Sequence, residues 1–450
     1  MLSDPYSLTT QETALVGGLA GLIVWEVWRS WKGRDPLQAY QPTIFVGAIL
    51  TYYCLIGPLR AIANGEWVDR GLDLRNTMVW AWAGSLIFYG ALLIGYHSLP
   101  RWRWKSRFTG IYLPTENWRK LASRLNWVGI AFYTIGSGPV VLAQLNPFGA
   151  REAIQELSAS GIDLGAWSNY FSLCLNFLIP GTILLFGCWV IDRKGLSQWL
   201  LWMLVGAGLF TTSGFRWRLV VLLAPISLLW FLARQRRPKA LFLALFASGL
   251  IFIGGYVGIT RTYGLGLDVS RLEGESTSEI FNAGFREASI FLTTGGLIAQ
   301  SPDRYPFVGL TPIKNVLTFF IPRQLWPQKG TNEYISRATY TLYGGPRAGG
   351  SALLNIAEYY LMFGWPSLIA MSLLLGVTLR SLYEWFLLNR YDLSAQVVYI
   401  CSACFLYVVI SRGYLPQVAA LLSYTVIPLA LLRGWAIQNY LRTRYPQRRA

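Results

Sequence analysis

The sequence predicts an all-α, polytopic membrane protein. Of its 450 residues, 54% are hydrophobic and only 14% are charged, and the mean hydropathy is +0.39. A soluble domain of this length needs more polar side chains to cover its surface. The apolar residues are also gathered into runs of about 20, the length that an α-helix needs to cross the hydrocarbon core of a bilayer.

Eleven such runs are bounded by charged residues or by Pro and Gly clusters, and we expect each to be a transmembrane helix. They are 11–28, 43–61, 77–98, 126–145, 168–190, 197–213, 218–233, 240–259, 352–379, 394–411 and 415–434. A run that holds two helices, or a loop segment that re-enters the bilayer, would bring the total to twelve or more.

The distribution of basic residues predicts the orientation, because Lys and Arg are retained on the cytoplasmic side of a membrane. If the N-terminus lies outside, the cytoplasmic segments hold 23 of the 39 Lys and Arg residues, and the C-terminus is cytoplasmic. The net charge of +17 then reflects topology, so we expect a lipid bilayer and not a nucleic acid as partner. The opening MLSDPYSLTTQE has no basic residue, so no cleavable signal is predicted.

No internal repeat is visible, and we predict a single integral membrane domain over residues 1–450 with two long connections. Residues 99–125 alternate Arg or Lys with Trp and then show a helical pattern, which predicts a cytoplasmic amphipathic segment on anionic lipid. Residues 260–351 form a long external loop region, and loops of this length usually carry function.

Within this loop region, residues 276–299 predict an amphipathic helix over the mouth of the membrane domain. Its apolar stripe consists of Phe281, Phe285, Ala288 and Leu292. Its polar counter-stripe consists of Glu275, Glu279, Asn282 and Arg286.

Arginine dominates the external face, where 14 of 16 basic residues are Arg. The planar guanidinium pairs with two phosphate oxygens and stays charged at low dielectric, which suits a diphosphate ligand. Arg216 and Arg218, in TTSGFRWRLVV, are the best placed, because they follow N-cap residue types and begin a helix whose positive dipole end faces outward. The alternative is that both side chains extend to lipid headgroups.

Four further arginines are candidate ligands of the diphosphate, namely Arg261 in GITRTYG, Arg286, Arg347 between glycines, and Arg412 in SRGYLP. Arg261 and Arg412 fit equally well as helix-end anchors. Arg286 and Arg347 are candidates only because of where they lie in the external loop region.

The segment FFIPRQLWPQKG, residues 319–330, predicts a stiff cationic loop. Pro322 and Pro327 fix the backbone, so Arg323 and Lys329 are presented to a diphosphate without an ordering cost. Trp326 offers a flat apolar face of the kind that stacks on sugar rings. The alternative is an interfacial anchor built from Trp and Pro.

A polar stripe marks the helix that begins in SALLNIAEYYLMFG. Ser351, Asn355 and Glu358 share one face of it, and we predict that Asn355 binds sugar. A carboxylate at membrane depth is costly and indicates function. Glu358 is either a general base or a structural partner of an arginine, and the sequence leaves both open.

The sequence predicts no metal site and no cofactor. Its single histidine, His97, lies near the cytoplasmic end of the third predicted span, and no carboxylates have metal-ligand spacing. All five cysteines fall inside predicted spans, where they behave as small hydrophobic residues.

These motifs, in this order, resemble the Wzy-type oligosaccharide repeat-unit polymerases of bacteria, the O-antigen and common-antigen polymerases. The resemblance rests on SGFRWRLVV, ITRTYG, FVGLTP leading into FFIPRQLWPQKG, and SALLNIAEYYLMFG, and it covers roughly residues 211–365. The N-terminal part adds only a matching hydropathy plan. Related polymerases are usually drawn with more than eleven spans.

The resemblance implies a GT-C-like glycosyltransferase in the bacterial inner membrane, with its active site facing the periplasm. Such an enzyme polymerises undecaprenyl-diphosphate-linked oligosaccharides into a surface polysaccharide without a metal, as in lipopolysaccharide or exopolysaccharide synthesis. A chain-length regulator protein and a flippase are implied as candidate partners.

The resemblance also assigns roles to individual residues. Arg216, Arg261, Arg323 and Lys329 match positions in the family's motifs. Arg216 is expected to be catalytic by stabilising the leaving diphosphate. Glu358 is not assigned by the resemblance but inferred from its placement, and as a catalytic residue it would take the proton of the acceptor hydroxyl.

Two other functions stay open at this point. An O-antigen ligase uses similar donors, but that family looks to use a histidine in an external loop, which is missing from this sequence. A transporter or flippase of lipid-linked oligosaccharides predicts inverted repeats and charges at mid-membrane depth. The cations here gather instead at one external face.

Overall fold

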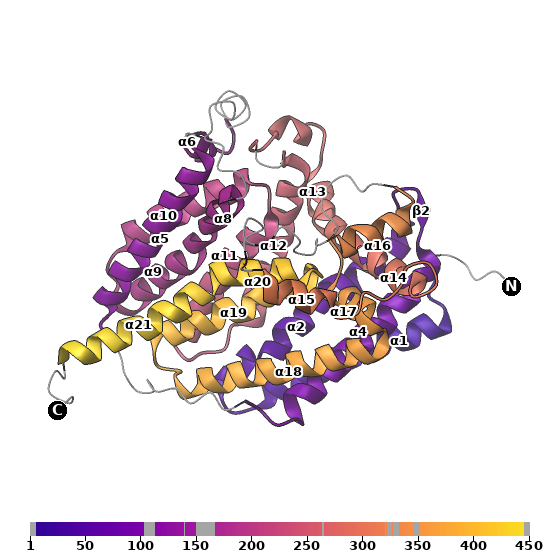
Figure 1. The fold of residues 1–450 in the computed structure, drawn as a ribbon, viewed down its shortest axis with the longest axis horizontal. Helices are drawn as coiled ribbons and strands as arrows, with labels where there is room; N and C mark the ends of the chain where they lie inside the picture. The colour runs from indigo at the N-terminus through magenta and orange to yellow at the C-terminus, as the bar shows by residue number, and fades with distance from the viewer. Residues whose placement is uncertain are drawn as a thin grey trace. The chain divides into compact units, whose positions relative to one another are not determined.

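The computed structural model describes residues 6–102, 113–138, 140–149, 167–262, 265–319, 321, 326, 333–345 and 352–444. Within these ranges the regular secondary structure is helical apart from an antiparallel hairpin of β1 (Val68–Asp69) and β2 (Leu72–Asp73) and an isolated bridge between Arg261 and Leu267 (Figure 1). The predicted helical class is confirmed.

The chain forms two compact units, each assembled from three segments. Unit 1 consists of Met1–Arg103, Phe285–Tyr383 and Leu406–Ala420, and unit 2 consists of Trp104–Gly284, Glu384–Phe405 and Leu421–Ala450. Both units therefore bring together parts of the chain that are far apart in the sequence.

The elements of unit 1 are α1 (Thr10–Lys32), η1 (Pro36–Tyr40), α2 (Pro42–Leu50), η2 (Thr51–Ile56), α3 (Gly57–Asn64), the hairpin, η3 (Arg75–Thr77), α4 (Met78–His97), α14 (Ile290–Gln300), α15 (Thr311–Thr318), α16 (Tyr334–Tyr343) and α17 (Asn355–Phe363). Those of unit 2 are α5 (Thr115–Ser137), α6 (Val140–Gln144), α8 (Trp167–Leu173), η4 (Cys174–Phe177), α9 (Leu178–Asp192), α10 (Leu196–Thr212), α11 (Arg216–Leu232), α12 (Ala240–Thr260), η5 (Val269–Leu272), α13 (Thr277–Ala283) and α21 (Ile427–Arg444). Four elements have residues in both units: η6 (Gly284–Ser289), α18 (Trp365–Leu388), α19 (Leu393–Ser411) and α20 (Leu415–Thr425).

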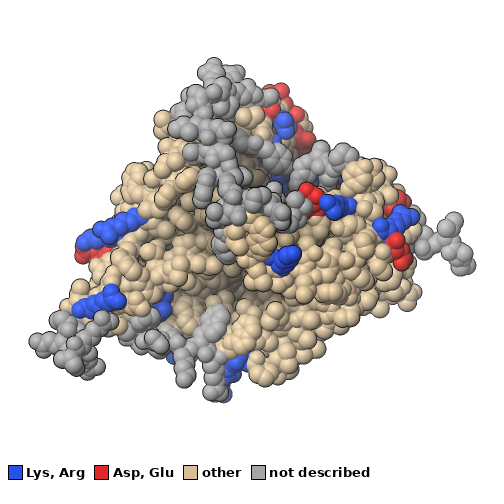
Figure 2. All heavy atoms as spheres, in the orientation of Figure 1, with Lys and Arg blue, Asp and Glu red and all other residues tan. Residues whose placement is uncertain are grey.

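Among the described residues, seven helical stretches are long and apolar enough to cross a membrane. They are Pro42–Asn64, Arg75–His97, Tyr170–Asp192, Ala240–Thr260, Trp365–Leu388, Leu393–Ser411 and Leu415–Thr443. Each overlaps a predicted span, as expected for a multi-pass membrane protein. Where residues are described, the face drawn in Figure 2 carries few charged side chains, which suits contact with lipid.

The other four predicted spans are helical but do not meet these criteria of length and apolarity. They fall in α1, in α5 with α6, in α10 and in α11. The helices α10 and α11 have 17 residues each, which corresponds to about 25 Å against a hydrocarbon core of about 30 Å. Seven of the eleven predicted spans therefore overlap helices that are long and apolar enough to cross a membrane, and the other four stay predictions.

Two predicted boundaries are wrong. The run 352–379 is not one span, because Gly364 has φ 74° and ends α17 before α18 begins. A residue with a positive φ of this kind cannot continue an α-helix. The amphipathic part of residues 99–125 is not a separate short helix either, since α5 runs through to Ser137 and ends at Gly138, where φ is 60°.

The predicted amphipathic helix over residues 276–299 is three pieces, namely α13, η6 and α14. Ser276 begins α13 with a capping box, and its hydrogen bonds lower the pKa of Glu279. The stripes are correct as far as Ser289. Beyond it every residue of α14 except Ala299 is buried, and α14 packs against α4, α16 and α17. This helix is therefore part of the core of unit 1, and the prediction that it covers the membrane mouth is wrong.

Two glycines allow the backbones of α4 and α18 to touch. A Cβ atom at Gly376 would lie 2.2 Å from the carbonyl oxygen of Leu92, and one at Gly95 would lie 2.3 Å from that of Leu373. Neither fits without a shift of the backbone. Close approach at small residues is a common way for membrane helices to pack, since lipid supplies no hydrophobic driving force between them.

Gly376→Ala tests this contact. We expect it to lower the free energy of unfolding by about 1–3 kcal/mol, because the added methyl group must displace the α4 backbone. The matched control is Gly249→Ala in α12, where a Cβ atom meets nothing within 4 Å. That control should be neutral or stabilising by up to ~1 kcal/mol. Thermal unfolding in detergent measures both, and equal midpoints would contradict the close contact.

Candidate functional site

Two hydrogen bonds and one ion pair form a line in unit 1 that ends at the loop preceding α20. Arg412 in this loop lies with Nη2 3.6 Å from Glu287 Oε1, and Tyr407 donates to Glu287 Oε2 at 3.1 Å. Tyr53 in turn donates to the hydroxyl of Tyr407 at 2.9 Å. The line runs from a fully buried ring, Tyr53, to two half-buried ionised groups. We call these four residues the Glu287 line.

Tyr53 is placed by a π-helical turn, η2, which interrupts the helix Pro42–Asn64. Such turns insert an extra residue and are frequent at functional sites. The neighbouring Tyr52 stacks on Phe285, with ring centroids 5.7 Å apart, at the start of the segment that carries Glu287. The turn thereby aligns α2 and η6 at the buried end of the Glu287 line.

Glu358, on α17, is 1% exposed and is held by three hydrogen bonds. The backbone N–H of Leu415 donates to both carboxylate oxygens, at 2.8 and 2.9 Å, and the Tyr334 hydroxyl donates to Oε1. Leu415 is the first residue of α20, so the carboxylate occupies a helix N-terminus, where free N–H groups and the dipole favour negative charge.

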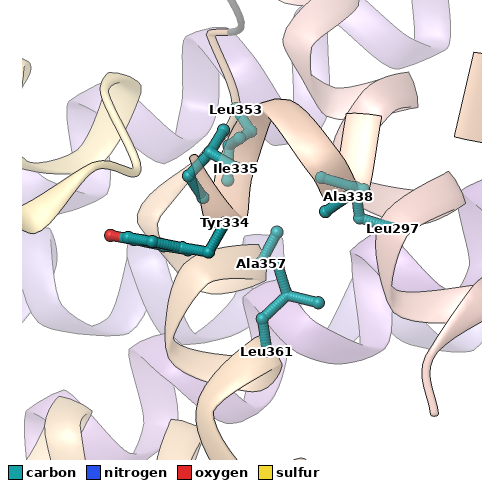
Figure 3. Close-up of a cluster of buried hydrophobic side chains, with 7 residues drawn as sticks. All are labelled: Leu297, Tyr334, Ile335, Ala338, Leu353, Ala357 and Leu361. Carbon is teal, nitrogen blue, oxygen red and sulfur yellow. The ribbon is translucent and has the colours of Figure 1, made fainter. Parts of the chain in front are cut away.

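The ring of Tyr334 packs on a cluster of buried apolar side chains, and Figure 3 shows its hydroxyl directed away from them. The cluster consists of Leu297, Ile335, Ala338, Leu353, Ala357 and Leu361 beside Tyr334. This apolar cluster therefore positions the Tyr334 hydroxyl, which donates to Glu358. These contacts give Glu358 a structural role as the N-terminal partner of α20, while its role as a general base stays a prediction.

Arg216 and Arg218 lie in the first turn of α11 in unit 2, and each residue is 9% exposed. The Nε of Arg218 donates to Asn176 Oδ1 at 3.1 Å. Its guanidinium carbon lies 5.2 to 5.9 Å from the ring centroids of Phe215, Trp217 and Phe210. No carboxylate of the described residues forms an ion pair with it. Both side chains are buried within unit 2, and their role at a diphosphate stays a prediction.

Gly258 makes room for Arg216. A Cβ atom there would lie 2.3 Å from Arg216 Nη2, so the guanidinium rests on the backbone of α12. Arg261 caps the same helix one turn later and is half-buried. Within unit 2 the structure therefore brings the motifs SGFRWR and GITRTYG together.

The positions of the remaining predicted site residues do not test the roles predicted for them. Arg286 is exposed on η6, Trp326 is 38% exposed, and Asn355 is 2% exposed at the start of α17. The predicted ligands Arg323, Lys329 and Arg347 lie outside the described residues. Sugar binding by Trp326 and Asn355 and diphosphate binding by all of these cations stay predictions.

Sequence reasoning missed Glu287 and its tyrosine partners. Glu287 belongs to neither stripe predicted over residues 276–299, and it lies in η6, a 3₁₀ helix with three residues per turn. Arg286 is exposed, as the polar stripe predicts, whereas Glu287 is half-buried. A 3₁₀ segment of this length leaves little signal in sequence, although the adjacent charges in FREAS mark a position where the apolar stripe is interrupted.

Comparison of the chain with protein-family models, with curated proteins and with solved structures finds no match.

Glu358→Ala tests the structural role of this carboxylate. Loss of the acceptor leaves the Leu415 N–H and the Tyr334 hydroxyl buried without it, so we expect unfolding to become easier by about 2–4 kcal/mol. Glu333→Ala removes an exposed glutamate whose ion pair with Arg337 lies at the surface, and it should change stability by less than about 0.5 kcal/mol. Thermal unfolding compares them. A Glu358→Ala protein as stable as the control would contradict the structural role of Glu358 at the N-terminus of α20.

Proposed function

We propose that this protein is a membrane glycosyltransferase that polymerises undecaprenyl-diphosphate-linked oligosaccharide repeat units into a surface polysaccharide at the periplasmic face of the inner membrane. The observation that carries the proposal is Arg218, a buried guanidinium that no described carboxylate neutralises. A buried charge without a counter-charge is costly, and an anionic ligand removes that cost. The resemblance to Wzy-type polymerases supplies the identity of the anion, a lipid-linked diphosphate.

The position of Arg218 suits a leaving diphosphate. It lies in the first turn of α11, where the helix dipole adds to the field of the guanidinium. In the reaction, the acceptor hydroxyl bonds to the anomeric carbon of the donor, and the bond from that carbon to the diphosphate oxygen breaks. The bonding pair leaves with the diphosphate, so its negative charge grows. Fixed guanidinium groups stabilise this charge more in the transition state than in the ground state.

The proton of the acceptor hydroxyl needs a base. The base predicted from the sequence is Glu358, and both of its carboxylate oxygens accept a hydrogen bond from the backbone N–H of Leu415. Glu287 is a second candidate, because its side chain is 18% exposed and its hydrogen bond from Tyr407 keeps the carboxylate oriented. Carboxylates act as general bases when they lie within hydrogen-bond reach of the proton, and a half-buried group is the easier one for a sugar hydroxyl to approach.

Replacing Arg218 tests the diphosphate role. In lipid nanodiscs with EDTA, the parent protein should convert undecaprenyl-diphosphate repeat units into a ladder of glycans on a gel. We expect Arg218→Lys and Arg216→Lys each to slow the ladder by about 10- to 100-fold, because an ammonium cannot reproduce the paired hydrogen bonds of a guanidinium. Arg337→Lys, at an exposed arginine, should behave as the parent.

A parent protein that binds these lipids without forming a ladder would instead favour a transporter or a ligase. A full ladder from both lysine variants would contradict the bidentate role of the arginines.

Replacing Glu287 separates the two candidate bases. Glu287→Gln keeps the shape of the side chain and removes its basicity, so we expect a loss of about 10²- to 10⁴-fold in polymerisation rate in a protein that still folds. Glu333→Gln is the matched control at an exposed glutamate. Polymerisation by Glu287→Gln at the parent rate would exclude Glu287 as the base.

A further inference from the structure

Asn176 is a buried polar side chain in an apolar stretch of unit 2. It lies in the run LCLNFLIPG and is 0% exposed. The backbone there forms η4, a 3₁₀ turn that interrupts the membrane-length helix Tyr170–Asp192. A 3₁₀ stretch inside a helix often marks a functional position, and a polar side chain in such an apolar segment is costly to keep.

The contact with Arg218 fixes the orientation of the Asn176 amide. Arg218 Nε donates to Asn176 Oδ1 at 3.1 Å. A guanidinium is a donor only, so the oxygen of the amide must face it and the nitrogen must face elsewhere. That nitrogen, Nδ2, is buried and has no hydrogen-bond partner among the described residues. Its two N–H groups therefore lie near a cation and lack an acceptor.

Arg218 has donors left over as well. Its Nε is used by Asn176, and no described residue accepts a hydrogen bond from its two Nη groups. Its other contacts are with the faces of three aromatic rings, those of Phe210, Phe215 and Trp217. The residue is 9% exposed, so it is not fully enclosed. Two side chains in direct contact thus hold several donors without acceptors.

A second buried asparagine of unit 2 provides a comparison. Asn126, on α5, is also 0% exposed, and neither its Oδ1 nor its Nδ2 has a partner among the described residues. Its amide packs on the backbone of Gly181, where a Cβ atom would lie 1.9 Å from Oδ1. It makes no hydrogen bond with a described cation. An unpartnered amide alone therefore does not indicate a ligand, whereas the amide of Asn176 shares its position with a guanidinium.

We propose that Asn176 is a second ligand of the anion at Arg218, and that it donates from Nδ2 to an oxygen of the same phosphate group. The inference rests on the proposed function, which supplies the diphosphate of a lipid-linked donor as that anion. A phosphate oxygen accepts more than one hydrogen bond, so one phosphate group satisfies the donors of both side chains. Asn176 therefore binds the substrate directly as well as holding the guanidinium.

Binding of sugar-free undecaprenyl diphosphate to the full chain tests this role without requiring turnover, and native mass spectrometry in detergent measures it. We expect Asn176→Ala to bind at least about tenfold more weakly than the parent, because a hydrogen bond to a charged group is lost. The matched control is Asn126→Ala, at the other buried asparagine, which should bind as the parent does. Asn176→Leu, of similar size, gives the same test if Asn176→Ala does not fold.

A double-mutant cycle separates a ligand from a residue that only orients Arg218. Lysine has a methylene group where arginine has Nε, so in an Arg218→Lys protein Asn176 has no N–H at that position to orient. We expect Asn176→Ala to weaken binding further in that protein, by at least about threefold, because its own hydrogen bond to the phosphate is still lost. Absence of a further loss would overturn the ligand role, as would parent-like binding by Asn176→Ala alone.

These outcomes are distinct from those that test the proposed function. A parent protein that binds undecaprenyl diphosphate through Asn176 but forms no glycan ladder would contradict the polymerase and keep the site. A ladder from the parent, with unchanged binding by the Asn176 variants, would keep the polymerase and contradict the role of Asn176. A parent protein that does not bind undecaprenyl diphosphate would contradict both.

Discussion

The carboxylate of Glu26 joins three helices of unit 1. It is fully buried on α1, accepts the hydroxyl of Thr43 on α2, and lies 3.2 Å from His97 at the end of α4, while Arg29 supplies the counter-charge. In an apolar protein a charge that is left without partners costs several kcal/mol, so these helices can meet in only one register. Helix placement in this part of the protein follows from where its ionised groups find partners.

The same constraint recurs elsewhere. Arg75 donates to Glu12 at 3.0 Å in unit 1, and Arg433 lies 2.8 Å from Asp392 in unit 2. Glu358 accepts hydrogen bonds from the Leu415 N–H at the start of α20 and from the Tyr334 hydroxyl, where the other buried carboxylates have a cation. Against this background Arg218 is unusual, because an amide oxygen and aromatic rings are its partners. That contrast is why it carries the functional proposal.

Hydropathy and charge were enough to predict the helical class and the seven membrane-length helices, because crossing a bilayer imposes length and apolarity directly on the sequence. They also pointed to Arg216 and Arg218, whose role at a diphosphate stays a prediction. The N-cap residue types before them do not cap α11, because Phe215 holds the N-cap position and makes no side-chain hydrogen bond there, while Thr211 and Thr212 end α10. Hydropathy and charge did not predict where helices break. The positive φ of Gly364 and the 3₁₀ turns around Glu287 are chosen by packing between distant segments, and a local pattern does not contain that information.

The segmented composition of unit 1 has a consequence for its biosynthesis. The contacts of α4 with α14 require residues from Ile290 onward, so at the usual ~5–20 residues per second translation supplies them roughly ten to forty seconds after α4 itself. Glu12 and Glu26 find their partners within the first hundred residues and are neutralised before that interval begins. The charge pairs of the first segment can therefore form before the C-terminal helices of unit 1 have been made.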